Sequence, residues 1–231
     1  MHPSREAFLQ AGHTLPNVRR DFPEWHLGRP HYALWALDVE TPAVAAAVAR
    51  AAMHLDGLLL DGYNRQAHIT LALCGFPTAT PRHPDDYGPA RFDAHCQALQ
   101  ALALKPFEID IGALASFTSA PFLQVDDPDG GIARLHQALG GDHPGGRYLP
   151  HTTVGLYAGN WPTDQVQQRL DALPDLPPQR CRVERVSLMH YTATEIGGPL
   201  TILADHELGS GRLRWRAPPP FPSASGSAIG G

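Results

Sequence analysis

Hydrophobic and polar positions in this 231-residue chain alternate between strand-like and helix-like spacing. Period-two runs bounded by turn residues predict strands near residues 31–39, 67–74, 107–114, 122–125, 148–157, 182–192 and 200–208. Helix-like spacing predicts helices near residues 41–55, 90–104, 129–139 and 163–173. Strands and helices are therefore intermixed along the whole chain, and a hydrophobic content of 43% is sufficient for a substantial core.

Local signals mark several of these boundaries. Thr41 before Pro42 is typical of a helix N-cap followed by proline in the first turn. Asp129 and Thr163 are the expected N-caps of two later helices. The proline-rich stretch 76–88 is expected to form a long surface loop.

Composition divides the chain into three parts. Residues 1–28 predict an irregular N-terminal segment, residues 29–215 one domain, and residues 216–231, rich in proline, serine and glycine, a disordered tail. The first twenty residues lack the continuous apolar run of a secretory signal, and no stretch reaches the roughly 20 apolar residues of a membrane span. Three cysteines without paired spacing fit a reducing compartment. We therefore expect a cytoplasmic, monomeric protein that does not enter a membrane.

One six-residue pattern occurs twice, as HITLAL beginning at His68 and as HTTVGL beginning at His151. Side chains alternate in an extended strand, so His68 and Thr70 share one face, as do His151 and Thr153. Each pair is followed on that face by a very small residue, which leaves room for a ligand. The opposite face, which ends at Leu73 in the first copy, is mostly apolar and suits a core.

A third His-x-Thr triplet begins at His190 but lacks the apolar continuation of the other two. A single histidine on a strand usually has a structural role, and we interpret His190 in that way. The repetition of the longer pattern in both halves of the chain favours a different role for His68 and His151. These two histidines are the candidates for one shared site.

Charge and missing motifs exclude several classes of function. A net charge of −5 argues against binding of a long nucleic acid duplex, although a small phosphorylated nucleotide or an RNA end fits. Arg65, Arg147, Arg182 and Arg185 are the candidates for a local basic patch. The sequence has no H-E-x-x-H, no C-x-x-C and no G-x-x-x-x-G-K-[ST] loop, so we expect no metal, no other cofactor and no ATP-dependent ligation.

The paired motifs resemble those of the 2H phosphoesterase superfamily, in particular its bacterial 2′-5′ RNA ligase-like branch, also described as RNA 2′,3′-cyclic phosphodiesterases. Residues 67–75 are similar to the first motif of that branch, and residues 148–155, with Pro150 before the histidine, to the second. Phe117 stands where members often place an aromatic residue. The resemblance covers about residues 30–208. It implies an α+β, bilobal fold in which two pseudo-symmetric antiparallel sheets, flanked by helices, form a central cleft and contribute one motif each.

The resemblance also implies an activity, the metal-independent hydrolysis of a 2′,3′-cyclic phosphate or a related small cyclic or 2′-linked phosphodiester. Opening the ring requires removal of one proton from water and supply of another to the leaving ribose oxygen. Histidine, with an unperturbed pKa of about 6.5, suits both tasks, so His68 and His151 are the expected acid/base pair. Thr70 and Thr153 are the expected donors to the non-bridging phosphate oxygens. Which histidine is the base stays open at this point.

Several alternatives accompany this hypothesis. Phe117 and Tyr148 are candidates for stacking on a base, together with Tyr157 and Trp161, and core packing is the alternative for all four. The protein is also compatible with ATP-independent 2′-5′ RNA ligase-like processing of RNA ends, or with nucleotide binding without turnover. Cleavage of cyclic oligonucleotide signals is a fourth possibility.

Overall fold

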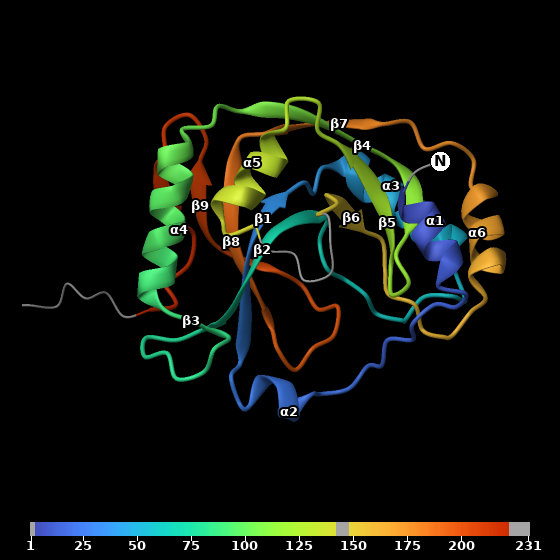
Figure 1. The fold of residues 1–231 in the computed structure, drawn as a ribbon, viewed down its shortest axis with the longest axis horizontal. Helices are drawn as coiled ribbons and strands as arrows, with labels where there is room; N and C mark the ends of the chain where they lie inside the picture. Colours follow the sequence, from blue (N-terminus) through green and yellow to red (C-terminus); the bar gives the residue numbers. More distant parts are fainter. Residues whose placement is uncertain (1–2, 142–147, 222–231) are drawn as a thin grey trace, which may run out of the picture.

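The computed structural model describes residues 3–141 and 148–221 (Figure 1). The strands in these ranges are β1 (His31–Asp38), β2 (His68–Pro77), β3 (Asp86–Tyr87), β4 (Phe107–Ser116), β5 (Pro121–Asp126), β6 (His151–Thr153), β7 (Gln179–Val183), β8 (Arg185–Thr192), β9 (Thr201–Glu207) and β10 (Leu213–Trp215). The helices are α1 (Pro3–Gln10), α2 (Pro23–His26), α3 (Pro42–His54), α4 (Pro89–Leu102), α5 (Gly131–Ala138) and α6 (Thr163–Asp171). Most elements between β1 and β9 lie close to their predicted positions.

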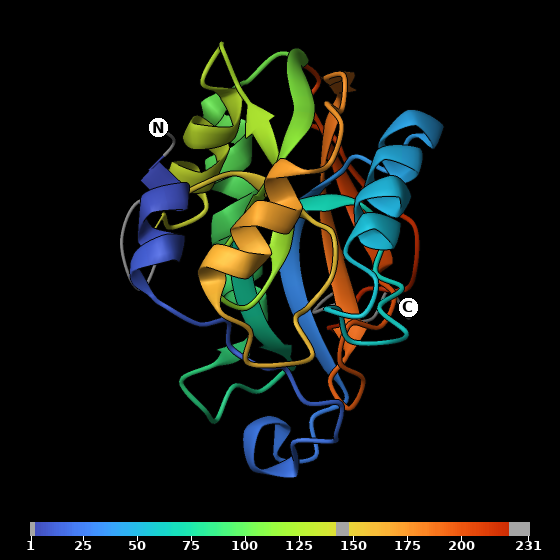
Figure 2. The same ribbon diagram turned by 90° about the vertical axis from the view of Figure 1, so that its right-hand side faces the viewer.

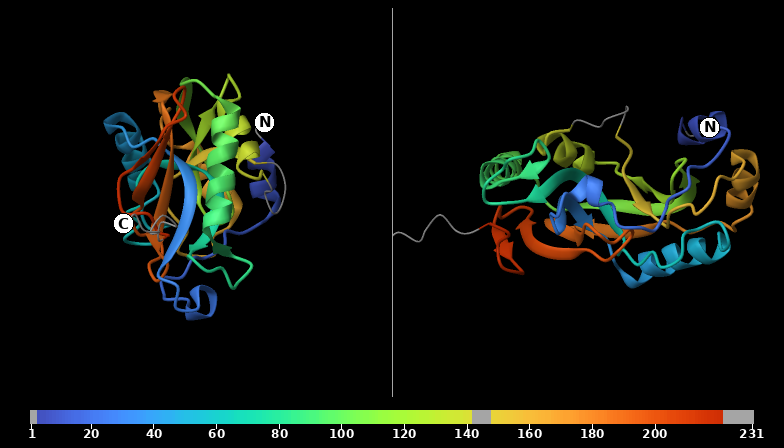
Figure 3. Two further views of the ribbon diagram at one scale, coloured as in Figure 1. Left: turned by 90° about the vertical axis from the view of Figure 1, so that its left-hand side faces the viewer. Right: turned by 90° about the horizontal axis from the view of Figure 1, so that it is seen from below.

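The strands form two sheets, and each sheet carries one of the repeated motifs. The larger has the order β10-β9-β8-β1-β2-β3 and is antiparallel except where β2 meets β3. The smaller has the order β6-β5-β4-β7 and is antiparallel throughout. Viewed from below, the strands lie in layers, with α5 on one side and α3 on the other (Figure 3). The predicted α+β fold with two antiparallel sheets and flanking helices is confirmed.

The chain changes sheets within the segment predicted as one strand at residues 182–192. β7 pairs with β4 in the smaller sheet, whereas β8 pairs with β1 and β9 in the larger sheet. Glu184 alone separates the two strands. The sequence pattern is extended on both sides of this residue, so it contains no signal for the change of partner.

The N-terminal segment is not irregular throughout, contrary to the prediction for residues 1–28. α1 lies beside α6, as Figures 1 and 2 show, and Phe8 on α1 is buried in a cluster with Tyr157, Val166 and Leu170. An eight-residue helix is marginally stable alone, so its formation depends on this tertiary contact. A short pattern of this kind is hard to recognise in a sequence.

The predicted disordered tail also requires correction at its beginning. Arg216 forms an ion pair of 2.7 Å with the buried carboxylate of Asp205. Phe221 is buried and packs against the rings of Tyr87 and Phe92. Residues 216–221 therefore pack on the domain, because one aromatic side chain and one guanidinium find partners there. Residues 222–231 lie outside the described residues.

One of three predicted helix caps is confirmed. The Thr41 hydroxyl accepts a hydrogen bond of 3.2 Å from the Val44 N–H at the start of α3. The N-cap residue of α5 is Gly130, and the side chain that caps the helix is that of Asp127 rather than Asp129, since its carboxylate accepts from the N–H groups of the first two helical residues at 2.9 and 2.8 Å. Thr163 is the first residue of α6 and makes no cap, because its hydroxyl donates to the Leu9 carbonyl instead.

The regular alternation predicted for β2 is interrupted by two bulges. Leu71 and Cys74 have no opposite residue in β1, and both are buried. Each extra residue inverts the alternation beyond it. As a result, Leu73, which was expected in the core, is 62% exposed.

The second motif strand is shorter than predicted. β6 ends at Thr153, although the pattern suggests a strand to residue 157. Beyond β6 the chain leaves β5 and forms an isolated bridge between Tyr157 and Leu59. Gly155 lies so close to Leu59 that an added Cβ would be 2.9 Å from its Cδ1. The small residue in this motif therefore permits the close approach of another segment.

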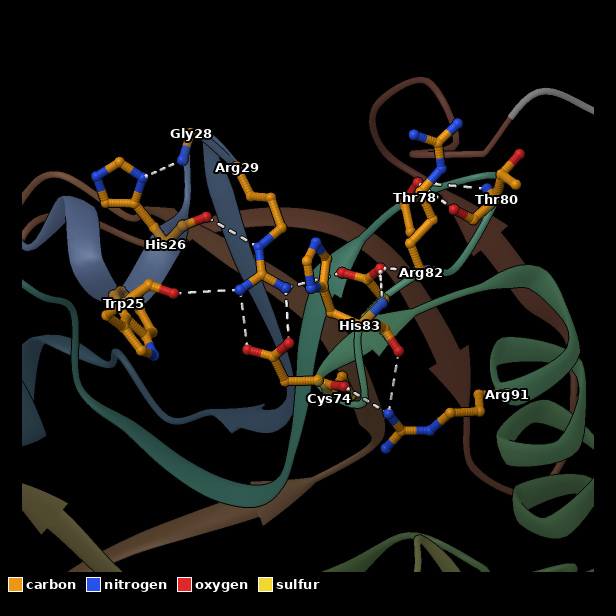
Figure 4. Close-up of polar contacts among 12 residues, drawn as sticks. Trp25, His26, Gly28, Arg29, Cys74, Thr78, Thr80, Arg82, His83 and Arg91 are labelled. Atoms are coloured by element: carbon orange, nitrogen blue, oxygen red, sulfur yellow. Dashed lines mark hydrogen bonds and ion pairs between the residues drawn. The ribbon is translucent and has the colours of Figure 1, made fainter.

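Arg29, which lies just before β1, binds the loop at residues 76–88 through ion pairs (Figure 4). Its guanidinium bonds both oxygens of Asp85, at 2.7 and 3.0 Å, and Asp86 at 2.8 Å. Burial raises the pKa of Asp86, but two main-chain N–H groups of the loop and Arg29 outweigh it and lower this pKa to about 2. The predicted surface loop is thus held at a defined place, and its end forms β3.

None of the helices in the described part of the chain has the length and apolar character needed to cross a membrane.

Candidate active site

The two motifs lie next to each other, although they belong to different sheets. β2 lies between β1 and β3, and β6 is the edge strand beside β5. β2 and β6 pack against each other, although they belong to different sheets. His68 and His151 are the first residues of these strands. The fold therefore brings together the two histidines that the sequence predicts for one site.

Both imidazoles are oriented in the same way by the main chain. His68 Nδ1 lies 2.7 Å from the carbonyl oxygen of Gln66, and His151 Nδ1 lies 2.8 Å from that of Leu149. A carbonyl oxygen only accepts hydrogen bonds, so Nδ1 carries the proton in each ring. In the neutral ring the lone pair is then on Nε2, which becomes the atom that accepts or delivers a proton.

His68 is adapted to remain neutral. It is 8% exposed, and burial lowers its pKa to about 4. The Gln66 carbonyl opposes this change, whereas the positive charge of Arg65 and the neighbouring His151 lower the pKa further. Near pH 7 His68 is therefore an unprotonated imidazole, which is the state required of a general base.

His151 is half-buried against two aromatic rings. The ring of Phe117 meets it edge-on at 4.9 Å and 82°, and that of Phe122 at 5.3 Å and 60°. Phe117 also stacks on Phe122, with centroids 4.3 Å apart. Phe117 therefore supports the imidazole. Its predicted stacking on a substrate base stays a prediction.

Thr153 has a partner that sequence reasoning did not identify. The side chain of Tyr63 lies beside that of Thr153, and burial raises the pKa of Tyr63. Tyr63 packs closely on Gly197, where an added Cβ would lie 2.8 Å from its Cδ2. Tyr63 precedes the first motif by five residues but contacts the second, so only the fold connects it to Thr153. Thr70 and Thr153 are both half-buried.

The third triplet lies apart from this arrangement. His190 is opposite Ala33 in β1, whereas His68 is opposite Asp38, and these two positions of a regular strand point to opposite faces. The ring of His190 packs on that of His31 at 4.2 Å, and burial lowers its pKa to about 4. This placement agrees with the structural role predicted for His190.

A family model described as the 2′-5′ RNA ligase superfamily matches residues 39–195, which include both motifs. The chain belongs to this superfamily. Its matched region contains Tyr63 as well as the four predicted site residues. No curated protein matches the chain.

The solved structure of E. coli LigT shows the same fold at low sequence identity. E. coli LigT complexed with 3′-AMP is 16% identical, with 78% of this chain and 99% of LigT covered and a TM-score of 0.51. TT0787 of Thermus thermophilus is also 16% identical, with 77% and 98% covered and a TM-score of 0.49. The similarity to LigT supports the 2H phosphoesterase fold of the 2′-5′ RNA ligase superfamily.

Tyr148 links the two motifs in this member of the 2′-5′ RNA ligase superfamily. Its hydroxyl donates to the Thr70 carbonyl at 2.8 Å. Its ring stacks on His136 of α5, with centroids 3.7 Å apart, and His136 Nδ1 lies 2.6 Å from the Leu71 carbonyl. Burial raises the pKa of Tyr148. Tyr148 thus connects the segment that precedes β6 with the main chain of β2. Its predicted stacking on a substrate base stays a prediction.

Among the described arginines predicted for a basic patch, Arg65 is the one whose positive charge acts on His68. Arg182 and Arg185 form ion pairs with carboxylates, and Arg147 lies outside the described residues. Arg65 Nε donates to the Gly198 carbonyl at 3.1 Å. Among the residues that the structure describes, no carboxylate pairs with Arg65, so its positive charge remains available to an anion beside His68.

A cavity of about 250 Å³ lies against His68. Its lining combines the carboxylates of Asp38 and Glu40 with the apolar side chains of Met189, Leu200 and Ile202. Asp38 is directly opposite His68 in the β1–β2 pair, so both face the same side of the sheet. Within residues 3–141 and 148–221, no three His, Cys, Asp or Glu side chains gather where they could hold a metal ion.

Proposed function

We propose that the protein is a phosphodiesterase that hydrolyses a 2′,3′-cyclic phosphate, or a related small cyclic or 2′-linked phosphodiester, by two-histidine acid/base catalysis. The matching Nδ1 contacts of His68 and His151 carry this proposal, because they leave the two Nε2 atoms as a proton acceptor and a proton donor. Membership of the 2′-5′ RNA ligase superfamily supports it. The LigT structure supports a nucleotide as ligand, since that protein is complexed with 3′-AMP.

In the proposed reaction His68 is the base and His151 the acid. Water attacks phosphorus, and His68 Nε2 takes one of its protons as the new P–O bond forms. The opposite P–O bond to the ribose breaks, and protonated His151 delivers its Nε2 proton to the leaving ribose oxygen. The product is a phosphate monoester, and one proton exchange with solvent restores both rings. The lowered pKa of His68 supports its assignment as the base.

The two threonines and Arg65 hold the phosphate in this scheme. The hydroxyls of Thr70 and Thr153 donate to the non-bridging oxygens, where charge increases in the transition state. Tyr63, whose side chain lies beside that of Thr153, positions the Thr153 hydroxyl in this scheme. Arg65 adds a positive charge. Its hydrogen bond to the Gly198 carbonyl fixes the orientation of the guanidinium. None of these steps requires a metal ion.

The direct test is product analysis with 2′,3′-cyclic mononucleotides and a small panel of cyclic oligonucleotides in EDTA. His68→Ala and His151→Ala should each lower kcat by about 100-fold or more, as expected for loss of a general acid or base. His83→Ala is the matched control, because His83 is exposed in the loop at residues 76–88. Circular dichroism of each variant would show whether the fold is intact.

Three other outcomes would contradict the proposal. Cleavage that requires an added divalent ion would exclude the metal-independent scheme. Binding of an unchanged nucleotide without turnover would indicate a binding protein. Joining of RNA ends without any hydrolysis would favour the ligase-like alternative.

A further inference from the structure

Four side chains of alternating charge run across the larger sheet, from the position opposite His68 to the C-terminal segment. Asp38, at the end of β1, lies directly opposite His68 and lines the same cavity. Its Oδ2 pairs with Arg185 Nη2 of β8 at 3.1 Å. Arg185 Nε lies 3.7 Å from Oδ1 of Asp205 on β9, and Arg216 Nε lies 2.7 Å from the other oxygen of that carboxylate. These four residues form one charge network, in which every charge has a neighbour of opposite sign.

Asp205 is the buried centre of the charge network. It is only 2% exposed, so its carboxylate depends on partners within the protein. Ser187 Oγ donates to it at 2.7 Å, and Arg216 Nε donates to it at 2.7 Å. Arg185 Nε makes no hydrogen bond within the described residues, whereas Arg185 Nη2 donates to Asp38 at 3.1 Å. Arg185 therefore bonds Asp38 and is held near Asp205 by charge alone.

Three members of the charge network lie outside the region matched by the family model, which covers residues 39–195. Asp38 precedes that region, and Asp205 and Arg216 follow it. Arg216 belongs to the stretch whose composition predicted disorder, yet its N–H donates to the Leu203 carbonyl at 2.8 Å. The start of the C-terminal segment is thus attached to β9 through both its main chain and a charged side chain.

Charged and titratable groups face His68 from each element around it. Burial lowers the pKa of His68 to about 4, the charges of Arg65 before β2 and of His151 on β6 lower it further, and the negative charge of Asp38 opposes them. Glu40 lines the same cavity, and its carboxylate accepts a main-chain N–H at the start of the first motif. Among these groups, Asp38 is the carboxylate whose charge favours a proton on the imidazole.

A general base must be neutral at the working pH and still basic enough to accept a proton. An unbalanced carboxylate opposite the imidazole would stabilise the protonated ring, and no carboxylate there would leave a weaker base. Arg185 balances the charge of Asp38, so the pair lies between these two extremes.

We propose that Asp38 and Arg185 are positioning residues for His68, that their ion pair sets the electrostatic field at the imidazole, and that Asp205 and Arg216 keep Arg185 in this pair. Neither Asp38 nor Arg185 touches the substrate in this scheme. The C-terminal segment contributes to the reaction through Arg216, although it lies outside the region that the family model matches. This inference rests on the proposed role of His68 as general base.

The test is the pH dependence of kcat/KM for 2′,3′-cyclic AMP, whose acid limb reports protonation of the base in the free enzyme. Asp38→Asn removes a negative charge, so the midpoint of this limb should move to lower pH by about 0.3 pH units or more. Arg185→Gln leaves the carboxylate of Asp38 unbalanced, so the midpoint should move to higher pH by a similar amount. Arg216→Gln should move it in the same direction as Arg185→Gln but less, because it acts through Asp205.

Asp110→Asn and Arg180→Gln are the matched controls. These two residues form an ion pair of 3.2 Å between β4 and β7 of the smaller sheet, and neither lines the cavity beside His68. The same changes of charge at this pair should move the midpoint by less than about 0.2 pH units, because solvent and salt screen distant exposed charges. Arg185→Lys, which keeps the positive charge, should retain the wild-type midpoint.

A merely structural role of the charge network would lower kcat/KM at every pH without moving the midpoint. Unchanged midpoints in Asp38→Asn and Arg185→Gln, or movements in the same direction, would therefore overturn the proposal. Circular dichroism at each pH shows whether a variant is still folded.

Histidine NMR separates failure of the charge network from failure of the proposed function. The Cε1–H signal of His68, identified by its absence from the spectrum of His68→Ala, can be titrated without substrate. Opposite movements of its midpoint in Asp38→Asn and Arg185→Gln would support the charge network even if no cyclic phosphate is hydrolysed. Hydrolysis that is lost in His68→Ala, together with one His68 midpoint in all other variants, would leave the histidine mechanism in place and exclude the charge network.

Discussion

The histidines of the candidate site are both oriented by main-chain carbonyl oxygens. A carbonyl fixes the tautomer without adding a negative charge that would stabilise the imidazolium. Burial therefore dominates at His68 and lowers its pKa to about 4. The same contact at His151 points to Nε2 as the atom that reacts in the proposed mechanism, with two phenylalanine rings to support the imidazole. Similar main-chain contacts in different surroundings are consistent with the proposed roles of one histidine as base and the other as acid.

At this scale we predict a specific effect of Tyr63→Phe. The change removes the hydroxyl beside Thr153 but retains the ring that packs on Gly197. Loss of this polar neighbour should lower kcat/KM roughly 2- to 10-fold, because the Thr153 hydroxyl is no longer oriented towards the phosphate. Steady-state kinetics with a cyclic phosphate substrate checks this expectation.

Tyr32→Phe is the control for that substitution. Tyr32 is half-buried among aromatic rings, away from Thr153. Its kcat/KM should equal that of the wild type within about twofold. Equal activity of Tyr63→Phe and Tyr32→Phe would show that the Tyr63 hydroxyl does not position Thr153.

Individual elements of this fold depend on particular polar and glycine residues. α5 carries His136, which stacks on Tyr148 and contacts the Leu71 carbonyl of β2. The position of α5 therefore affects the segment that leads into the second motif. β2 depends on the bulges that bury Leu71 and Cys74 and on the positive φ of Gly75, which follows them within the strand. Both elements can be tested by substitutions that leave the reacting groups unchanged.

Asp127→Ala should destabilise the protein by about 0.5–2 kcal/mol, the usual effect of losing a helix N-cap. The carboxylate of Asp127 accepts from the Gly131 and Ile132 N–H groups, which then lose their partner. Urea unfolding measures the change. Asp129→Ala, at the position that the sequence favoured as the cap, should change the free energy of unfolding by less than about 0.5 kcal/mol. The opposite order of the two variants would refute the cap assignment.

Gly75→Ala should destabilise by about 3 kcal/mol or more, since it combines backbone strain with a steric clash. Gly75 has a φ of +107°, and an added Cβ would lie 2.0 Å from the Asp85 carbonyl oxygen, which accepts the Phe76 N–H. Gly57→Ala is the control, because its φ is +83° but no atom lies within 4 Å of an added Cβ. We expect a cost of about 1 kcal/mol for Gly57→Ala in thermal or urea unfolding. Equal costs would exclude the clash.

Across the whole molecule, one buried and two half-buried histidines that stay neutral contribute to the response to acid. Burial lowers the pKa of His68, His95 and His190 to about 4, whereas each titrates near 6.5 in the unfolded chain. His95 is held neutral by a further contact, since its Nδ1 accepts from Trp35 Nε1 at 3.1 Å. Between these two pH values the unfolded chain binds more protons than the folded one.

The free energy of unfolding should therefore be fully retained above about pH 6.5 and decrease as the pH falls towards 4. Urea unfolding at several pH values across this window measures the slope. His95→Gln, which keeps a polar group but does not titrate, should flatten the slope relative to the wild type. A free energy of unfolding that stays constant or rises between pH 6.5 and 4 would contradict the burial of these histidines as neutral groups.

Local pattern determined a large part of this fold in advance. Strand and helix periodicity predicted β1, α3, α4, β4 and β9, and the repeated motif predicted the pair of histidines that the fold brings together. These predictions succeed because they depend on neighbours in the sequence, such as Thr41 capping α3. The motif also led to the correct superfamily, since its six positions combine a reactive face with a core face.

Only the tertiary structure decided how distant segments meet. Distant parts of the chain meet where β7 and β8 pair with different sheets and where Tyr63 lies beside Thr153. The N–H groups of Leu15 and Asn17 likewise bond carbonyls of residues 118 and 157. α1 forms because Phe8 finds a buried place on α6, and Leu73 is exposed because bulges shift its register. The sequence by itself determined the chemistry of the two motifs, whereas packing between distant segments determined their surroundings, because such contacts leave no periodic signal in the chain.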